Sequence, residues 1–204
     1  TKAEFTFNTS RLWGKGVLPL ETYQLDYRKL QDVYPDLKKV DWVRFADIPA
    51  YRIIEGENER YIDASGTEVV ALNVPQKTIE EGFRKIHGND SKMTVTVLEK
   101  YDNYYLNLRR TLELPVYKVE FDDDDHNLYY VNPRDGYIRY LNKNKIVDKW
   151  LFSAIHYLNM GWLVNRPWLW TFCLWFLCIG CGIVCFTGVV LGVKTWLIKK
   201  KKKS

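Results

Sequence analysis

The feature that most constrains this chain is a long uncharged stretch near its C-terminus. No residue from Pro167 to Val193 carries a charge. At about 1.5 Å per residue, roughly 26 helical residues can cross a hydrocarbon layer about 30 Å thick with some tilt. A helix inside a soluble domain rarely runs so long without a charge. We therefore predict a transmembrane helix over residues 167–198 and a basic tail over 199–204.

Lysines around this segment predict its orientation in a membrane. The six that follow it are Lys194, Lys199, Lys200, Lys201, Lys202 and Lys203. The preceding flank carries Lys145, Lys149 and Arg166, with Asp148 among them. Lysine and arginine collect on the cytoplasmic side of a span, so we expect the tail in the cytoplasm and residues 1 to about 165 outside it. Lys199 and Lys200 are also placed to contact anionic lipid headgroups, which gives the same topology.

The charge balance argues against a nucleic-acid-binding protein, and the cysteine placement argues against a disulfide-stabilised outer domain. The formal net charge of the 204 residues is +5, and removing the six tail lysines leaves about −1. The outer domain therefore lacks a global basic field, and we expect no nucleic-acid partner. The four cysteines all lie in the uncharged stretch, so the outer domain uses no disulfide. Delivery of that domain across a membrane requires a cleaved signal peptide or an upstream helix, and the sequence leaves both open.

An internal repeat organises the outer domain. Residues 48–53 (IPAYRI) and 60–66 (RYIDASG) resemble residues 114–119 (LPVYKV) and 129–136 (YYVNPRDG). Each pair has an alternating apolar and polar run, a polar turn, a second run rich in β-formers, and then Asp or Asn followed by Gly. Such alternation predicts half-buried strands, and the Asp, Asn and Gly residues favour tight turns. We therefore expect two antiparallel hairpins.

Helical spacing precedes each hairpin. Leu20, Tyr23, Tyr27, Leu30 and Tyr34 recur every three or four residues before Pro35, which predicts a helix. A second helix is expected over 76–87, with a strand over 93–98 after it. The predicted class is α+β: two repeats of a helix and a hairpin or meander, over 1–74 and 75–145, then an interfacial helix over 146–166 and one transmembrane helix.

These motifs together resemble the PepSY domain, and the C-terminal part resembles the PepSY-associated transmembrane proteins of bacteria. The residues that carry the second resemblance are Leu114–Val119, Tyr130–Gly136, Trp150–Phe152, His156, Arg166–Trp168 and Thr187–Gly192. The resemblance covers nearly the whole chain in order. It implies a periplasmic PepSY pair held at the inner membrane by one helix. It also implies kinship with larger proteins that act in iron uptake and haem-linked ferric-siderophore reduction, and it implies no peptidase activity.

The segment before the span has the pattern of a helix lying at the membrane surface. Leu151, Ala154, Ile155, Leu158 and Trp162 form one apolar stripe at helical spacing. The tryptophans suited to the headgroup layer are Trp150, Trp162, Trp168 and Trp170.

His156, off that apolar stripe, could be an axial haem ligand. The family resemblance implies a second histidine where this chain has Ser153, which argues against haem. His87 and His126 lie too far along the sequence to complete a ligand set with His156. We therefore expect a hydrogen-bonded interfacial histidine and no cofactor, with haem as the alternative.

The span itself carries a stripe of small residues at intervals of three and four. These are Cys178, Cys181, Cys185, Gly188 and Gly192. Small side chains in line let two helix backbones approach closely, so we predict packing against another membrane subunit or a second copy of this chain. The three cysteines share a face that could bind copper or a cluster. Because thiolates are costly in hydrocarbon, we interpret them as small apolar groups and expect no metal.

No catalytic motif accompanies these features. Residues 122–125 are four consecutive aspartates, but they lack the alternating pattern of a calcium loop and suit a solvated turn. The sequence contains no phosphate loop, dinucleotide fingerprint or recognisable nucleophile and base pair. We predict an accessory or regulatory subunit, not an enzyme, in a larger membrane complex. A haem-linked electron carrier and a propeptide-like inhibitor of a periplasmic protease remain alternatives.

Overall fold

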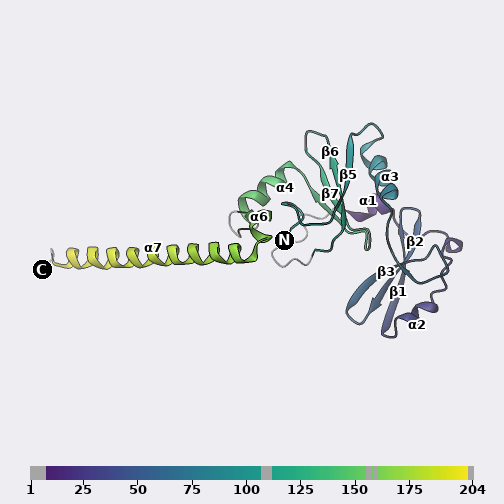
Figure 1. Ribbon diagram of the computed structural model, residues 1–204, viewed down its shortest axis with the longest axis horizontal. Helices are drawn as coiled ribbons and strands as arrows, with labels where there is room; N and C mark the ends of the chain where they lie inside the picture. The colour runs from purple at the N-terminus through teal and green to yellow at the C-terminus, as the bar shows by residue number, and fades with distance from the viewer. Residues whose placement is uncertain (1–7, 107–111, 155–157, 159, 202–204) are drawn as a thin grey trace. The chain divides into compact units, whose positions relative to one another are not determined.

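The computed structural model describes residues 8–106, 112–154, 158 and 160–201. Its internal contacts divide the chain into two compact units, Thr1–Trp150 and Leu151–Ser204. The first unit contains two four-stranded antiparallel sheets, and the second contains a long apolar helix (Figure 1). The chain is therefore α+β, as the alternation and the apolar stretch predict.

The first sheet is a meander in the order β1-β2-β3-β4. Its strands are β1 (Leu37–Phe45), β2 (Ile48–Glu55), β3 (Asn58–Asp63) and β4 (Val70–Ala71). Three short helices precede it: α1 (Thr9–Trp13), the 3-10 helix η2 (Leu20–Thr22) and α2 (Lys29–Val33). The predicted hairpin over 48–66 is confirmed as β2 and β3.

The second sheet repeats this topology, in the order β5-β6-β7-β8. It follows helix α3 (Gln76–His87) and contains β5 (Met93–Leu98), β6 (Val116–Phe121), β7 (Leu128–Val131) and β8 (Ile138–Leu141). Helix α4 (Lys143–Asp148) follows β8, with Asn142 as a side-chain N-cap. The predicted helix over 76–87, the strand over 93–98 and the second hairpin are confirmed. The predicted boundary at residue 74 falls in the connection between β4 and α3.

The two hairpins share their strand register. Tyr51 lies opposite Ile62 in the first, and Tyr117 lies opposite Val131 in the second. The Asp or Asn that follows each hairpin makes the same turn. Asp63 Oδ1 accepts a hydrogen bond from the Ser65 amide at 2.8 Å, and Asn132 Oδ1 accepts one from the Arg134 amide at 3.1 Å. The sequence likeness therefore corresponds to the same local geometry in both sheets.

Three apolar clusters hold this unit together. The cluster between the first sheet and the segment before it contains Tyr23, Leu25, Leu30, Tyr51, Ile53, Ile62 and Ala64. The central cluster, which joins both sheets to α1 and α3, contains Leu12, Trp13, Phe45, Ala50, Leu72, Val74, Ile79, Phe83, Val119, Phe121, Tyr129, Val131 and Ile138. The far side of the second sheet carries Tyr105, Val116, Leu128, Tyr130 and Leu141. Alternate residues of each strand thus enter different clusters, as the strand period requires.

The Trp13 side chain, at the end of α1, makes a buried polar contact with the turn that follows β7. Its buried indole N–H donates to the Gly136 carbonyl at 2.7 Å, and its ring packs edge-on against Phe45 with centroids 5.5 Å apart. A second backbone link joins the Val74 amide to the Pro133 carbonyl at 2.8 Å. Gly136 has a φ of +64°, and a Cβ there would overlap the Phe45 ring. Only glycine fits this position without strain.

The predicted helix over 20–34 is wrong in its continuity. The segment contains only η2 and α2, separated by an extended stretch that packs on the first sheet. There the Tyr23 hydroxyl donates to the Val43 carbonyl at 2.8 Å, and the Gln24 amide donates to the Ala64 carbonyl at 2.8 Å. Hydrogen bonds from this stretch to the first sheet take the place of the backbone hydrogen bonds of a helix, although the apolar spacing suited a helix.

Most described residues of the second unit are helical. A π-helix over Lys149–Ala154 enters it, followed by α6 (Gly161–Val164) and α7 (Pro167–Lys201). The interfacial helix predicted over 146–166 is not continuous, because Leu158 has a φ of +51° and α6 begins only at Gly161. The transmembrane helix predicted over 167–198 lies entirely within α7.

Replacing Gly136 with alanine tests the link between the sheets. The positive φ costs about 1–2 kcal/mol and the overlap with Phe45 about 1–3 kcal/mol, so the free energy of unfolding should fall by at least about 2 kcal/mol. Gly56→Ala is the matched control, because Gly56 has a φ of +60° but no neighbouring atom within 4 Å of the place that an alanine Cβ would occupy. Denaturant titration in detergent, followed by tryptophan fluorescence, measures both. Equal losses would contradict the close packing at Gly136.

Candidate functional site

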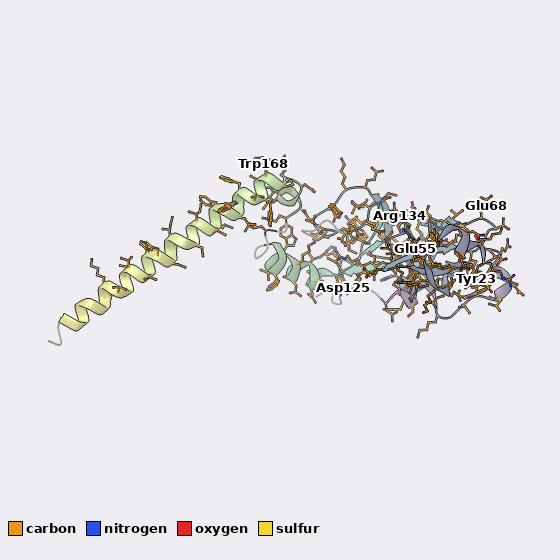
Figure 2. All side chains as sticks on the ribbon, turned by 90° about the horizontal axis from the view of Figure 1, so that it is seen from below. Tyr23, Glu55, Glu68, Asp125, Arg134 and Trp168 are labelled. Atoms are coloured by element: carbon orange, nitrogen blue, oxygen red, sulfur yellow. The ribbon has the colours of Figure 1, made fainter. Side chains whose placement is uncertain are left out.

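Helix α7 is the most exposed apolar surface of the described chain. Pro167 occupies its first position, where a missing amide hydrogen costs nothing. The stretch Pro167–Thr195 is 29 residues long and apolar enough to cross a membrane, and none of its most apolar window is buried. Figure 2 shows side chains projecting outward along α7, beginning near Trp168. Water does not stabilise such a surface, so this helix requires lipid or another helix around it.

The predicted small-residue stripe is intact along α7. Cys178, Cys181 and Cys185 are exposed free thiols, and no atom lies within 4 Å of a Cβ built at Gly188 or Gly192. The opposite face carries bulky exposed side chains, for example Phe176 at 70% and Phe186 at 71% exposure. Nothing in the described chain covers either face of this apolar stretch.

The predicted tryptophan anchors are exposed or half-buried, whereas a lysine of the preceding flank is buried. The exposed tryptophans are Trp150, Trp162 and Trp168, while Trp170 is half-buried. The backbone of Lys199 and Lys200 continues α7. Lys149, expected to be a flanking surface charge, is buried instead. Its Nζ donates to the Tyr104 carbonyl at 2.9 Å, and burial, with Arg139 nearby, lowers its pKa to about 8.

The candidate metal and haem ligands do not form a site in the described chain. No group of three or more His, Cys, Asp or Glu residues with metal-binding geometry occurs there. His156 lies outside the described residues. His87 is a packing residue, because its Nε2 is 2.9 Å from the Tyr129 hydroxyl and its ring lies 4.1 Å from that of Phe121. Burial lowers the pKa of His87.

A polar groove of about 400 Å³ lies beside β3 in the first unit. Its lining includes Arg60 and Tyr61 from β3, together with Glu113, Arg134 and Asp135 near the second sheet. The described lining residues include no histidine and no cysteine, and the Tyr61 hydroxyl donates a hydrogen bond to Glu59 Oε1 at 2.6 Å. Sequence reasoning assigned Asp135 only to a turn, and the Asn-Pro-Arg-Asp-Gly pattern gave no signal of its place in a groove.

The carboxyl group of Asp135 is held by its turn and partly shielded from water. The Tyr137 amide donates to Asp135 Oδ1 at 2.8 Å, while the Asn132 side-chain amide donates to Glu113 Oε2 at 3.0 Å. Burial raises the pKa of Asp135, and the negative charge of Glu113 adds to that rise. This carboxyl is therefore part of the turn that presents Gly136 to Trp13.

No family model matches the chain, and no curated protein or solved structure is significantly similar to it. The function must therefore be argued from α7, its flanks and the two sheets alone.

Asp135→Asn should stabilise the protein at neutral pH. A carboxyl with a raised pKa in the folded state stabilises it below the usual pKa of about 3.9, and that stabilisation is lost as pH rises through the folded-state pKa. Asparagine keeps the Oδ1 acceptor for Tyr137 but carries no charge. The gain in denaturation midpoint should be largest near pH 7 and vanish near pH 3.

Asp63→Asn is the matched control for this comparison, because Asp63 Oδ1, like Asp135 Oδ1, accepts a hydrogen bond from the backbone amide two residues later. Denaturation midpoints of both variants and the parent chain between pH 3 and pH 8 measure the effect. A gain for Asp135→Asn that does not change with pH would contradict the argument.

Proposed function

We propose that this chain is a non-catalytic PepSY-like membrane protein, an accessory or regulatory subunit of a larger bacterial inner-membrane complex. The observation that carries the proposal is α7: a helix long enough to cross a membrane, exposed on all sides, with Cys178, Cys181, Cys185, Gly188 and Gly192 in one stripe. The two sheets of the first unit would then contact the extramembrane parts of partner subunits.

The stripe supports helix packing more strongly than lipid contact. Glycine costs about 1 kcal/mol of helix propensity relative to alanine, and a lipid-facing position gains nothing in return. Lipid tails are as apolar as leucine, so helices associate in a membrane by close van der Waals contact and not by the hydrophobic effect. A groove bounded by Gly188 and Gly192 provides that contact for a neighbouring backbone.

The asymmetry of charge supports an outer domain in the periplasm. The lysines from Lys199 to Lys203 follow the uncharged stretch in the sequence, the first three of them within the last turn of α7, whereas Lys149 before it is buried and donates to the Tyr104 carbonyl. Burial of Lys149 strengthens the imbalance, since it removes a cation from the surface of the outer flank. The matching registers of the two hairpins support the PepSY-like repeat.

The lack of a reaction centre in the described chain favours an accessory role. Asp135, the groove carboxyl with the raised pKa, is bound by the backbone of its own turn. No described residue favours the haem-linked alternative over this one.

Leucine at both Gly188 and Gly192 should release the partner helix. The added side chains would fill the groove and hold the two backbones apart. Mild-detergent purification followed by native mass spectrometry should show loss of most of the associated subunit. The matched control is Gly180→Leu, at a glycine of α7 that lies off the stripe and likewise has no neighbouring atom within 4 Å of the place that an added Cβ would occupy. Equal association of the double variant and this control would refute the docking face.

Protease digestion of sealed spheroplasts tests the proposed topology. With the chain in a bacterial inner membrane, external protease should degrade the first unit and leave a short fragment that contains α7 and the lysine tail. Inverted vesicles should give the reverse result, a protected first unit with only the tail removed. An antibody tag at each end of the chain identifies the fragments. Protection of the first unit in spheroplasts would overturn the orientation.

A further inference from the structure

Among the described residues, strand β5 leaves one edge of the second sheet unpaired. Within that part of the chain it bonds only to β6, and it is the first strand in the order β5-β6-β7-β8 (Figure 1). Its six residues, Met93–Leu98, carry no charge and no proline. Val97 is 53% exposed, and Thr94 and Thr96 are also exposed. A flat edge of this composition is a template for pairing with another strand.

The hydrogen bonds of β6 identify which β5 groups face outward. The Asp122 amide donates to the Lys92 carbonyl at 3.0 Å, so Lys92 and the alternate residues after it face β6. The outward-facing amides and carbonyls are those of Met93, Val95 and Val97. None of these three has a backbone partner on that side among the described residues.

The other sheet edges are protected in ways that β5 is not. Strand β1 carries Lys38, Lys39, Asp41 and Arg44 and has a register irregularity between Leu37 and Lys39. Strand β4 has two residues and β8 has four, one of them Arg139. Charges, bulges and short length are the usual means of preventing edge pairing. The β5 edge therefore differs from the rest of the described sheet edges in being open to a partner.

We propose that β5 pairs with β5 of a second copy of this chain, antiparallel, with Val95 opposite Val95 at a two-fold axis. Antiparallel pairing must place outward-facing residues opposite outward-facing residues. This register does so throughout, because Met93 of each copy meets Val97 of the other. The two sheets become one continuous sheet of twice the width, and the pairing does not depend on the helix stripe of α7.

The side-chain pattern of β5 favours this register for a second copy. With Val95 at the axis, Thr94 lies opposite the partner's Thr96 and Met93 opposite the partner's Val97, so polar residues meet polar residues and apolar residues meet apolar ones. Moving the axis to Thr96 also satisfies the hydrogen-bonding rule. It would, however, place Lys92 opposite the partner's Lys100 and leave Met93 opposite the partner's Glu99. Opposed like charges destabilise a strand pair, so the Val95 register is favoured.

Cysteine cross-linking of the full chain tests both the pairing and its register. The four native cysteines, all in α7, are first replaced by alanine. Cα atoms of a hydrogen-bonded antiparallel pair lie about 5.5 Å apart, within the range that a disulfide spans. In lipid nanodiscs treated with copper phenanthroline, Val95→Cys should convert most of the 24.2 kDa chain to a band of twice that mass. Thr96→Cys, the matched control, should give only a trace of it.

A proline variant gives an independent measurement. Val97→Pro removes an outward-facing amide, leaves the bonds to β6 and replaces a side chain that is 53% exposed, so it should abolish the β5-dependent dimer in native mass spectrometry while the thermal midpoint changes little. Preferential cross-linking of Thr96→Cys, or no cross-linking by either cysteine variant, would overturn the proposed pairing. A dimer that persists in Val97→Pro would overturn it as well. Loss of the dimer only in the Gly188 and Gly192 variant would assign association to α7 instead.

Discussion

The hydrogen bond from the Trp13 indole to the Gly136 carbonyl is the contact on which the first unit depends. Each sheet alone is a small meander with limited apolar surface, and such sheets need a further layer for stability. The two sheets supply this layer for each other. The Trp13 side chain contacts Phe45 of the first sheet and Gly136 in the turn after β7. The bond is buried, so losing the indole donor would leave an unsatisfied carbonyl in the central cluster.

Helix α7 differs from the first unit in leaving its apolar side chains exposed. The first unit satisfies its apolar residues internally, whereas α7 leaves Phe176, Phe186 and their neighbours without cover in the described chain. Its backbone is satisfied within the helix, which is the condition for a segment to enter lipid. The chain therefore combines a part stabilised by burial with a helix whose apolar surface suits a bilayer, and a substitution in one need not affect the other.

The sequence predicts those parts of the fold in which local pattern and tertiary environment agree. Local pattern identified β2, β3, β5, β6 and β7, because their apolar residues enter the clusters and turn residues bound the two hairpins. It missed β1, whose Lys38, Lys39, Asp41 and Arg44 obscure the period at an exposed edge. The helix expected over 20–34 is not formed, because the Tyr23 hydroxyl donates to the Val43 carbonyl of the first sheet, a contact that no local pattern contains.

The burial of Lys149 and the groove position of Asp135 likewise arise only from tertiary packing. The stripe on α7 could be predicted, because helical spacing alone determines which of its residues share a face.

The β5 edge and the α7 stripe offer two association surfaces governed by different forces. Pairing at β5 gains its specificity from backbone hydrogen bonds and from the cross-strand pairs of Met93 with Val97 and of Thr94 with Thr96, and it can form in water. Packing at Gly188 and Gly192 depends on shape in a medium without a hydrophobic effect. If both surfaces act on the same second copy, membrane tethering raises the effective concentration of each β5 edge, so a short strand pair becomes sufficient for association. If α7 instead binds a different subunit, β5 pairing would link two such complexes through their outer domains.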